Sequence, residues 1–244
     1  MKILISQKEP SSTSAYSSLK EKFNVEVEFH PLYLIEPLSD KEFRAQRINL
    51  QDYSAVVFSS RHAIDAYFKL CDSLRVKVPD TMKYFCTTEM VAMYLQKHIV
   101  FRKRKIFFGD GTPSSLVSLI GPKHKEEKFL ITAAEGSNPA AITRLFDEKK
   151  LDYSVGYLVK PVSQDLKGVD LHSFDYMVLY NPSDVKSLYE NYPDFRPGDI
   201  KFISFGKSIV KAMTEAGLET IFQGPTPDAP SAAKAIELCL SSGK

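Results

Sequence analysis

Short apolar runs recur along the chain, each followed by small polar residues and then by apolar residues at helical spacing. In one such block the run 55–58 (AVVF) precedes Ser59 and Ser60, and a helical pattern follows over residues 63–70. An uninterrupted apolar run indicates a strand that is buried on both faces. Small polar residues are typical of a helix N-terminus. Repetition of strand, polar turn and helix predicts a parallel, doubly wound α/β sheet.

Three of these blocks occur twice, in the same order in each half of the chain. The segment VVFSSRHAIDAYF from Val56 aligns with VLYNPSDVKSLY from Val178, an offset of 122 residues (178 − 56). The offsets of the other two pairs are 118 (201 − 83) and 117 (230 − 113). The second pair aligns Lys83 with Lys201, and the third aligns Pro113 with Pro230. Three matched blocks at nearly constant offset predict two similar domains.

Two extended segments that contain proline predict where the chain passes from one domain to the other. They are VEVEFHPLYLIEPL from Val25 and YSVGYLVKPV from Tyr153. If they pair, we expect two flavodoxin-like doubly wound domains, joined by a two-segment extended linker, with a hinged cleft between them. The predicted ranges are 1–35 plus 166–244 for a discontinuous domain, 38–160 for an inserted domain, and 33–38 and 158–168 for the linker.

The polar turns are the places where a ligand is expected. In sheets of this type the turns lie at the carboxyl edge of the strands, where ligands usually bind. Helix N-termini there present free N–H groups and the positive end of the helix dipole, which favours anions. The alternative for each hydroxyl is that it only caps its helix. Similarly, Gly136 permits either a close approach to a ligand or simply a tight turn.

Composition narrows the class of protein. The chain is 43% hydrophobic and 25% charged, with a net charge of +2, which gives no argument for nucleic acid or a membrane surface. Its three cysteines have no disulfide or zinc spacing, so we expect a reducing cytosol. No apolar run reaches the length of a signal peptide or a spanning helix. Known hydrolase, metalloprotease and nucleotide-loop motifs are missing, and GDGTPSS from Gly109 resembles a phosphate loop only loosely.

The order and duplication of these motifs resemble the uroporphyrinogen-III synthase family over nearly the whole chain. The family pattern FTS..A after the first strand of each half is matched by FSSRHA from Phe58 and YNPS from Tyr180. The pattern IG.TTA..L...G is matched by FGKSIVKAMTEAG from Phe205. The family's glycine before a helix, and its linker tyrosine, are matched by Gly136 and Tyr157. The final helix pattern P(T/S)...L...I is matched by APSAAKAIELCL, residues 229–240.

This resemblance implies a cyclising hydro-lyase of haem and tetrapyrrole biosynthesis. Such an enzyme removes water from hydroxymethylbilane, a linear tetrapyrrole polycarboxylate, and closes the ring with inversion of the last pyrrole ring. The resemblance implies no metal and no organic cofactor, and we expect a cytoplasmic monomer that binds neither nucleic acid nor membrane. From the residues alone Tyr157 is more simply a tyrosine that packs in the core or linker, whereas the resemblance implies that it assists departure of the hydroxyl group. The expected substrate-binding residues are Ser59, Ser60, Arg61, Thr88, Gly136, Ser137, Asn138, Asn181, Ser183, Lys207 and Ser208.

Two other functions remain compatible with the sequence. One is a non-catalytic, hinge-bending module that binds an anionic ligand or a protein partner, because fold alone permits it. Three departures from the family pattern favour this alternative. Thr88 stands where the family commonly has Gly, and Val91 and Ile209 stand where it commonly has Thr. The other is a glycosyl or phosphoryl transferase with two α/β domains. It ranks last because no nucleotide loop is recognisable.

Overall fold

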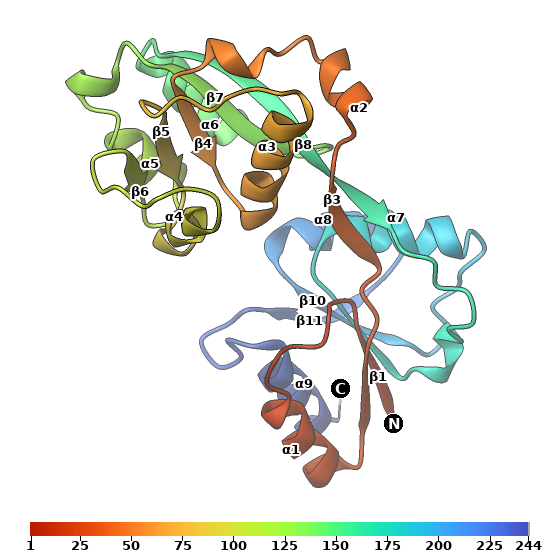
Figure 1. Ribbon diagram of the computed structural model, residues 1–244. Coiled ribbons are helices and arrows are strands. Elements are labelled where there is room, and N and C mark those ends of the chain that lie inside the picture. The colour runs from red at the N-terminus through yellow and green to blue at the C-terminus, as the bar shows by residue number, and fades with distance from the viewer. Residues whose placement is uncertain (244) are drawn as a thin grey trace. The chain divides into compact units, whose positions relative to one another are not determined.

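The computed structural model describes residues 1–243, apart from the side chain of Lys207, and separates into two compact units (Figure 1). Unit 1 comprises Met1–Leu34 and the chain from Val162 onward, and unit 2 comprises Ile35–Pro161. None of the helices described is both long and apolar enough to cross a membrane.

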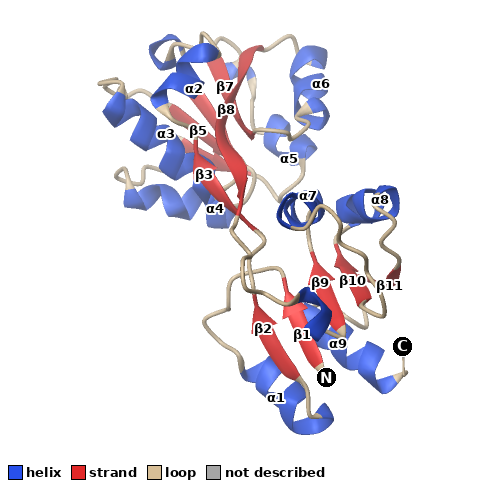
Figure 2. Cartoon of the chain, turned by 90° about the vertical axis from the view of Figure 1, so that its right-hand side faces the viewer, coloured by secondary structure: helices blue, strands red, loops and turns tan. Residues whose placement is uncertain are grey.

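Unit 1 contains a parallel five-stranded sheet in the order β11-β10-β9-β1-β2. Helices α7 and α8 cover one face, and α1 and α9 cover the other (Figure 2). All four residues of β9 are buried, as expected for a strand covered on both faces. The bounds are β1 Lys2–Ile5, α1 Ser14–Phe23, β2 Glu26–Phe29, η4 Leu171–Ser173, β9 Tyr176–Leu179, α7 Pro182–Asn191, β10 Lys201–Phe205, α8 Lys207–Glu215, β11 Thr220–Gly224 and α9 Ala232–Ser241.

Unit 2 contains a six-stranded sheet in the order β3-β8-β7-β4-β5-β6, and the pairs from β8 to β6 are parallel. Helices α2, α3 and α4 pack on one face, and α5 and α6 on the other. The bounds are β3 Tyr33–Pro37, α2 Asp40–Ala45, η1 Leu50–Asp52, β4 Ala55–Phe58, α3 Arg61–Ser73, β5 Lys83–Cys86, α4 Glu89–Tyr94, η2 Leu95–Lys97, β6 Ile106–Phe108, α5 Pro113–Ser118, η3 Pro122–His124, β7 Lys128–Ala134, α6 Ala140–Glu148 and β8 Asp152–Ser163.

Apart from the additional edge strand β3 of unit 2, the two sheets have equivalent strand orders, but the chain runs through them in a permuted sequence. The repeat seen in the sequence pairs β4, β5 and β6 with β9, β10 and β11. On this correspondence β7-α6-β8 of unit 2 matches β1-α1-β2 of unit 1. That fourth block follows the other three in unit 2 and precedes them in unit 1, so no constant offset reveals it. The fold class expected from the sequence, two similar doubly wound α/β units, is confirmed.

The polar turns start helices because their side chains accept backbone N–H groups. The first N–H groups of a helix have no partner within the helix, and a Ser, Thr or Asn oxygen satisfies one of them. Each such cap contributes about 1 kcal/mol to stability. The capping residues are Ser39 for α2, Ser60 for α3, Thr88 for α4, Thr112 for α5, Asn181 for α7 and Ser231 for α9.

Candidate functional site

The turns predicted to bind a ligand lie at the sheet edges where the chain order reverses. In unit 2 the reversal falls between β4 and β7, and in unit 1 between β9 and β1. Doubly wound sheets commonly bind ligands beside such a reversal, beyond the carboxyl ends of the strands. Residues 59–61 follow β4, residues 136–138 follow β7, and Thr88 follows β5, so the strand order of unit 2 brings these three predicted turns to one edge.

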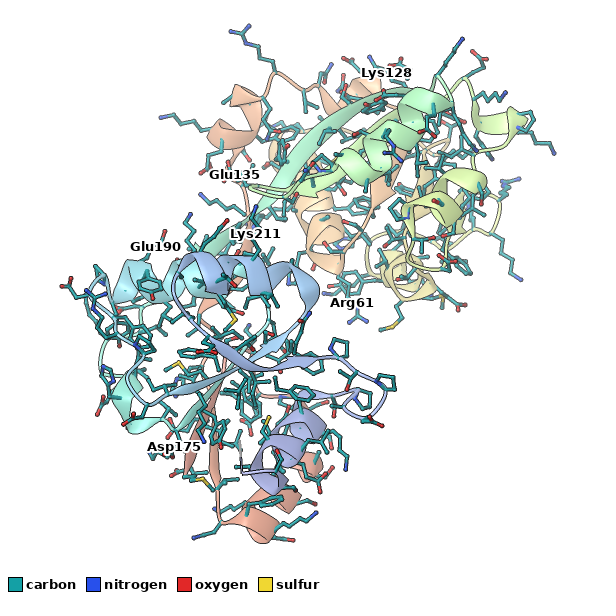
Figure 3. All side chains as sticks on the ribbon, turned by 180° about the vertical axis from the view of Figure 1, so that it is seen from behind. Arg61, Lys128, Glu135, Asp175, Glu190 and Lys211 are labelled. Carbon is teal, nitrogen blue, oxygen red and sulfur yellow. The ribbon has the colours of Figure 1, made fainter. Side chains whose placement is uncertain are left out.

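The start of α3 offers unpaired donors at this edge. Ser60 Oγ accepts the Ala63 N–H at 3.1 Å and so acts as the helix cap. The N–H groups of Arg61 and His62 form no hydrogen bond within the part of the chain that is described. Ser59 and Arg61 are exposed, and Figure 3 labels Arg61 at this end of the helix. Two free N–H groups, the helix dipole and a guanidinium together favour an anion.

The Gly136–Asn138 turn uses its side chains to hold its own shape. Ser137 Oγ donates to the Ala134 carbonyl at 2.6 Å, and Asn138 Oδ1 accepts the Ala140 N–H at 2.9 Å. Gly136 has φ +76°, and a Cβ there would meet no atom within 4 Å. Glycine is therefore favoured at this position by the left-handed backbone and not by crowding.

Tyr157 lies on β8, beside the end of β7, and its backbone is held by Gln46. Gln46 Nε2 donates to the Tyr157 carbonyl at 2.8 Å, and Gln46 Oε1 accepts the Tyr157 N–H at 2.9 Å. Tyr157 pairs with Ala133, after which the β7–β8 register shifts so that Ala134 pairs with Val159. Such irregularities redirect side chains near functional sites. Tyr157 is half-buried, and its phenol forms no hydrogen bond among the described residues.

The turn after β9 differs from that after β4, because its N–H groups are already bonded. Asn181 Oδ1 accepts the Ser183 N–H at 3.1 Å, while Asp184 Oδ2 accepts the N–H groups of Tyr180 and Asn181 at 2.8 and 2.9 Å. Burial raises the pKa of Asp184 to about 6, although those two N–H groups and the nearby Ser6 hydroxyl act to lower it. Asn181 Oδ1 and the Ser183 N–H therefore satisfy each other, and the Ser183 N–H is not an open donor for a ligand.

The turn after β10 depends on an unusual glycine. Gly206 has φ +141°, its N–H donates to the Gly224 carbonyl at 2.8 Å, and a Cβ would lie 3.2 Å from the Tyr180 carbonyl oxygen. Lys207 begins α8, but its side chain lies outside the part that the structure describes. Ser208 is exposed in the first turn of the helix.

Comparisons with known proteins identify the family of this chain. Residues 14–234 match the family described as Uroporphyrinogen-III synthase HemD. The chain belongs to the uroporphyrinogen-III synthase family. This family consists of cyclising lyases of haem biosynthesis that act on a small molecule. The predictions of family, function and enzyme class are thus confirmed.

Solved structures of this family share the fold. A mutant uroporphyrinogen III synthase from the extremely thermophilic bacterium Thermus thermophilus is 14% identical, with a TM-score of 0.57. A uroporphyrinogen-III synthetase from Helicobacter pylori is 15% identical, with a TM-score of 0.59. In both cases the match covers 99% of this chain and 99% of the other. No curated protein sequence matches the chain significantly.

The glycine-containing loop GDGTPSS of this family member is shaped by an internal carboxylate. Asp110 Oδ1 accepts both the N–H and the hydroxyl of Thr112, at 2.9 and 2.7 Å, and the Asp110 N–H donates to Ser115 Oγ at 3.0 Å. The side chains of Ser115 and Thr112 and the Thr112 N–H lower the pKa of Asp110 to about 2. The Asp110 carboxylate accepts both donors of Thr112, and the N–H groups of Gly109 and Gly111 donate to the Cys86 and Thr87 carbonyls, so the loop offers few donors to a phosphate.

Sequence reasoning missed two residues that hold the candidate site in place. Gln46 contacts Tyr157 across 111 positions, and no local motif marks it. Asp184 lies three residues after Asn181, the spacing of a capping box, and that signal was available in the sequence. Within the described residues, no group of three or more His, Cys, Asp or Glu side chains could hold a metal ion.

Proposed function

We propose that this uroporphyrinogen-III synthase binds the carboxylates of hydroxymethylbilane chiefly at the start of α3. The observation that carries this proposal is the pair of unbonded N–H groups of Arg61 and His62, beside a guanidinium with no carboxylate partner among the described residues. Exposed Ser59 and the turn at residues 136–138 supply further contacts at the same edge. Ser60, Thr88 and Asn181 contribute by fixing the positions of their helices.

We propose that Tyr157 acts on the same substrate. It lies on β8, two strands from β4, and strand spacing makes that separation about 10 Å. A linear tetrapyrrole is long enough to be held at α3 while its hydroxymethyl carbon lies near the phenol. The phenol donates a proton as the carbon–oxygen bond breaks, so that water leaves and a cationic azafulvene remains. The substituted carbon of the last ring attacks that cation, and the proton lost later in the cyclisation balances the one donated.

The protein's main contribution is to select which carbon attacks. Closure without the enzyme joins the unsubstituted position and gives the type I isomer, so the enzyme must hold the chain in the less accessible arrangement. That Lys207 and Ser208, which begin α8, also contact the substrate stays a prediction from the sequence. We also propose a cytoplasmic monomer that needs no nucleic-acid partner, supported by the burial of Cys71 and Cys86 and by a net charge of only +2.

An isomer assay tests the proposed function directly. Freshly made hydroxymethylbilane is mixed with the protein, the products are oxidised, and type I and type III uroporphyrin are separated by chromatography. Predominantly type III product, in proportion to the amount of protein, is expected. Only type I product, at the rate of the protein-free control and with protein that is folded by circular dichroism, would refute the function.

A further inference from the structure

The outer face of α4 is apolar although it is exposed to solvent. Met90 and Met93 are 67% and 47% exposed and lie three residues apart, which places them on one face of the helix. Tyr94 follows four residues after Met90 and extends that face. Val91 and Ala92 are buried and pack into the core on the other side. We call Met90, Met93 and Tyr94 the α4 platform.

Two cations lie over the aromatic ring of the platform. The guanidinium carbon of Arg61 lies 5.5 Å from the centre of the Tyr94 ring, and Lys97 Nζ lies 5.0 Å from it. Lys97 Nζ also donates to the Tyr94 hydroxyl at 2.9 Å, and that hydrogen bond raises the pKa of Lys97. In the described part of the chain, Arg61 forms no ion pair, so its charge remains available to a ligand held against the platform.

The platform is fixed in position before any ligand binds. The Tyr94 hydroxyl donates to Asp65 Oδ2 at 2.8 Å, and His98 Nε2 lies 2.7 Å from Asp65 Oδ1. The His98 ring in turn stacks on Phe68, with ring centres 4.6 Å apart and planes 6° apart. Burial acts to raise the pKa of Asp65, but the hydrogen bonds from His98 and Tyr94 outweigh it and lower the pKa. Both Asp65 oxygens are therefore occupied, and a fixed ring loses little entropy when a ligand stacks on it.

We propose that the α4 platform binds the flat face of a pyrrole ring of the linear tetrapyrrole, while Arg61 pairs with a carboxylate at the rim of that ring. This proposal rests on the proposed function, because hydroxymethylbilane is the ligand that combines apolar ring faces with many carboxylates. Thioether side chains adapt to ring edges and faces, which suits a flexible substrate. Arginine can bind a carboxylate through two parallel hydrogen bonds. Glu89 is exposed in the first turn of α4, and its negative charge repels the carboxylates of such a ligand.

Methionine oxidation provides a direct test, because the six methionines of the chain fall into two groups. Met1 is 56% exposed, like the two platform residues, whereas the other three are at most 1% exposed. Dilute peroxide in the dark, followed by peptide mass spectrometry, should oxidise the exposed group only. Saturating uroporphyrin III should slow the oxidation of Met90 and Met93 at least threefold and leave Met1 unchanged. The three buried controls are Met82, Met177 and Met213.

Citrate at the same carboxylate concentration should give no protection, because it lacks the ring face. Unchanged oxidation of Met90 and Met93 while uroporphyrin III is bound, as shown by its fluorescence polarisation, would overturn the proposal. Protection of Met1 to the same degree would also overturn it, because the effect would then be general. The slowing of oxidation in the presence of ligand does not require turnover, so this result is separate from that of the isomer assay.

Steady-state kinetics give a second, independent measurement. The double variant Met90→Ser and Met93→Ser should raise the KM for hydroxymethylbilane about tenfold while kcat and the type III fraction change little. Arg61→Gln should raise KM by a similar factor, and Glu89→Gln should lower it. Arg44→Gln is the matched control, since Arg44 is an exposed arginine of α2 that forms no ion pair among the described residues. Type III product with unaltered KM in all platform variants would refute the platform and leave the proposed function intact.

Discussion

Replacing Asp184 by Asn should remove a large part of the pH dependence of stability. Asp184 is completely buried, and its pKa in the folded protein is raised from 3.8 to about 6, chiefly by burial. The unfolded chain releases this proton at a lower pH than the folded protein does. Folding is therefore penalised as pH rises through this window, since the folded state must either keep the proton or bury a charge. A difference of about two pKa units corresponds to roughly 3 kcal/mol.

The variant retains the shape of the side chain without its charge. An Asn oxygen can accept the N–H groups of Tyr180 and Asn181 as Asp184 Oδ2 does. Its amide can also face Ser6, whose Oγ, like Asp184 Oδ1, has no hydrogen-bond partner within the described residues. At about pH 4 the two proteins should be similarly stable, whereas by about pH 7 Asp184→Asn should have gained roughly 2–3 kcal/mol on the parent.

Urea unfolding, followed by circular dichroism at several pH values, measures this difference. The slope against urea should stay equal in the two proteins, so that midpoints report free energies of unfolding. Asp194→Asn is the control, because Asp194 is exposed and forms no hydrogen bond among the described residues. If the stability difference between parent and Asp184→Asn stays constant from about pH 4 to pH 7, the argument from burial is wrong.

Three further predictions concern the candidate site. Tyr157→Phe should lower kcat about 100-fold with little change in KM, because it removes only the proton donor; stopped-time assays of type III product measure this, and full turnover would exclude Tyr157 as the acid. Gln46→Leu should cost about 1–3 kcal/mol of stability, because the N–H and carbonyl of Tyr157 lose their partners, and it should also lower kcat. Gln51→Leu, at an exposed residue of η1, is the control variant. An unchanged kcat in Gln46→Leu would show that Gln46 does not position the tyrosine. Gly206→Ala should cost about 1–3 kcal/mol in urea unfolding, because φ +141° is strained for alanine and its Cβ would lie 3.2 Å from a carbonyl oxygen; Gly243→Ala, also at positive φ but with open space around it, should cost less.

Local patterns were sufficient to predict most of the secondary structure. The apolar run of β4 and the cap at Ser60 specify a strand and a helix start within a few residues, so they could be read without tertiary information. The permuted fourth block could not be found in the same way. Its two copies, β1-α1-β2 and β7-α6-β8, occur at opposite ends of their units in chain order, and pairing with neighbouring strands is what makes them equivalent.

The candidate site was predictable in position but not in detail. Strand ends specify which turns share an edge, so residues 59–61 and 136–138 could be placed together. Whether a donor is free depends on side chains from elsewhere in the fold. Asn181 and Ser183 looked equivalent to Ser59 and Ser60, but Asp184 binds the N–H groups of their turn. The hold of Gln46 on Tyr157 spans 111 residues, and no spacing rule detects such a contact.

The permuted chain order has a consequence during synthesis of the protein. β1 lies in the interior of its sheet, and its residues Ile3 and Leu4 are completely buried there against β2 and β9. The register pairs Leu4 with Met177, 173 residues later in the chain (177 − 4). At a translation rate of about 5–20 residues per second, β1 leaves the ribosome on the order of 10–35 s before β9 does. Unit 2, which is continuous in sequence, completes synthesis of its strands within that interval, whereas β1, an apolar interior strand of unit 1, has no β9 to pair with until the interval ends.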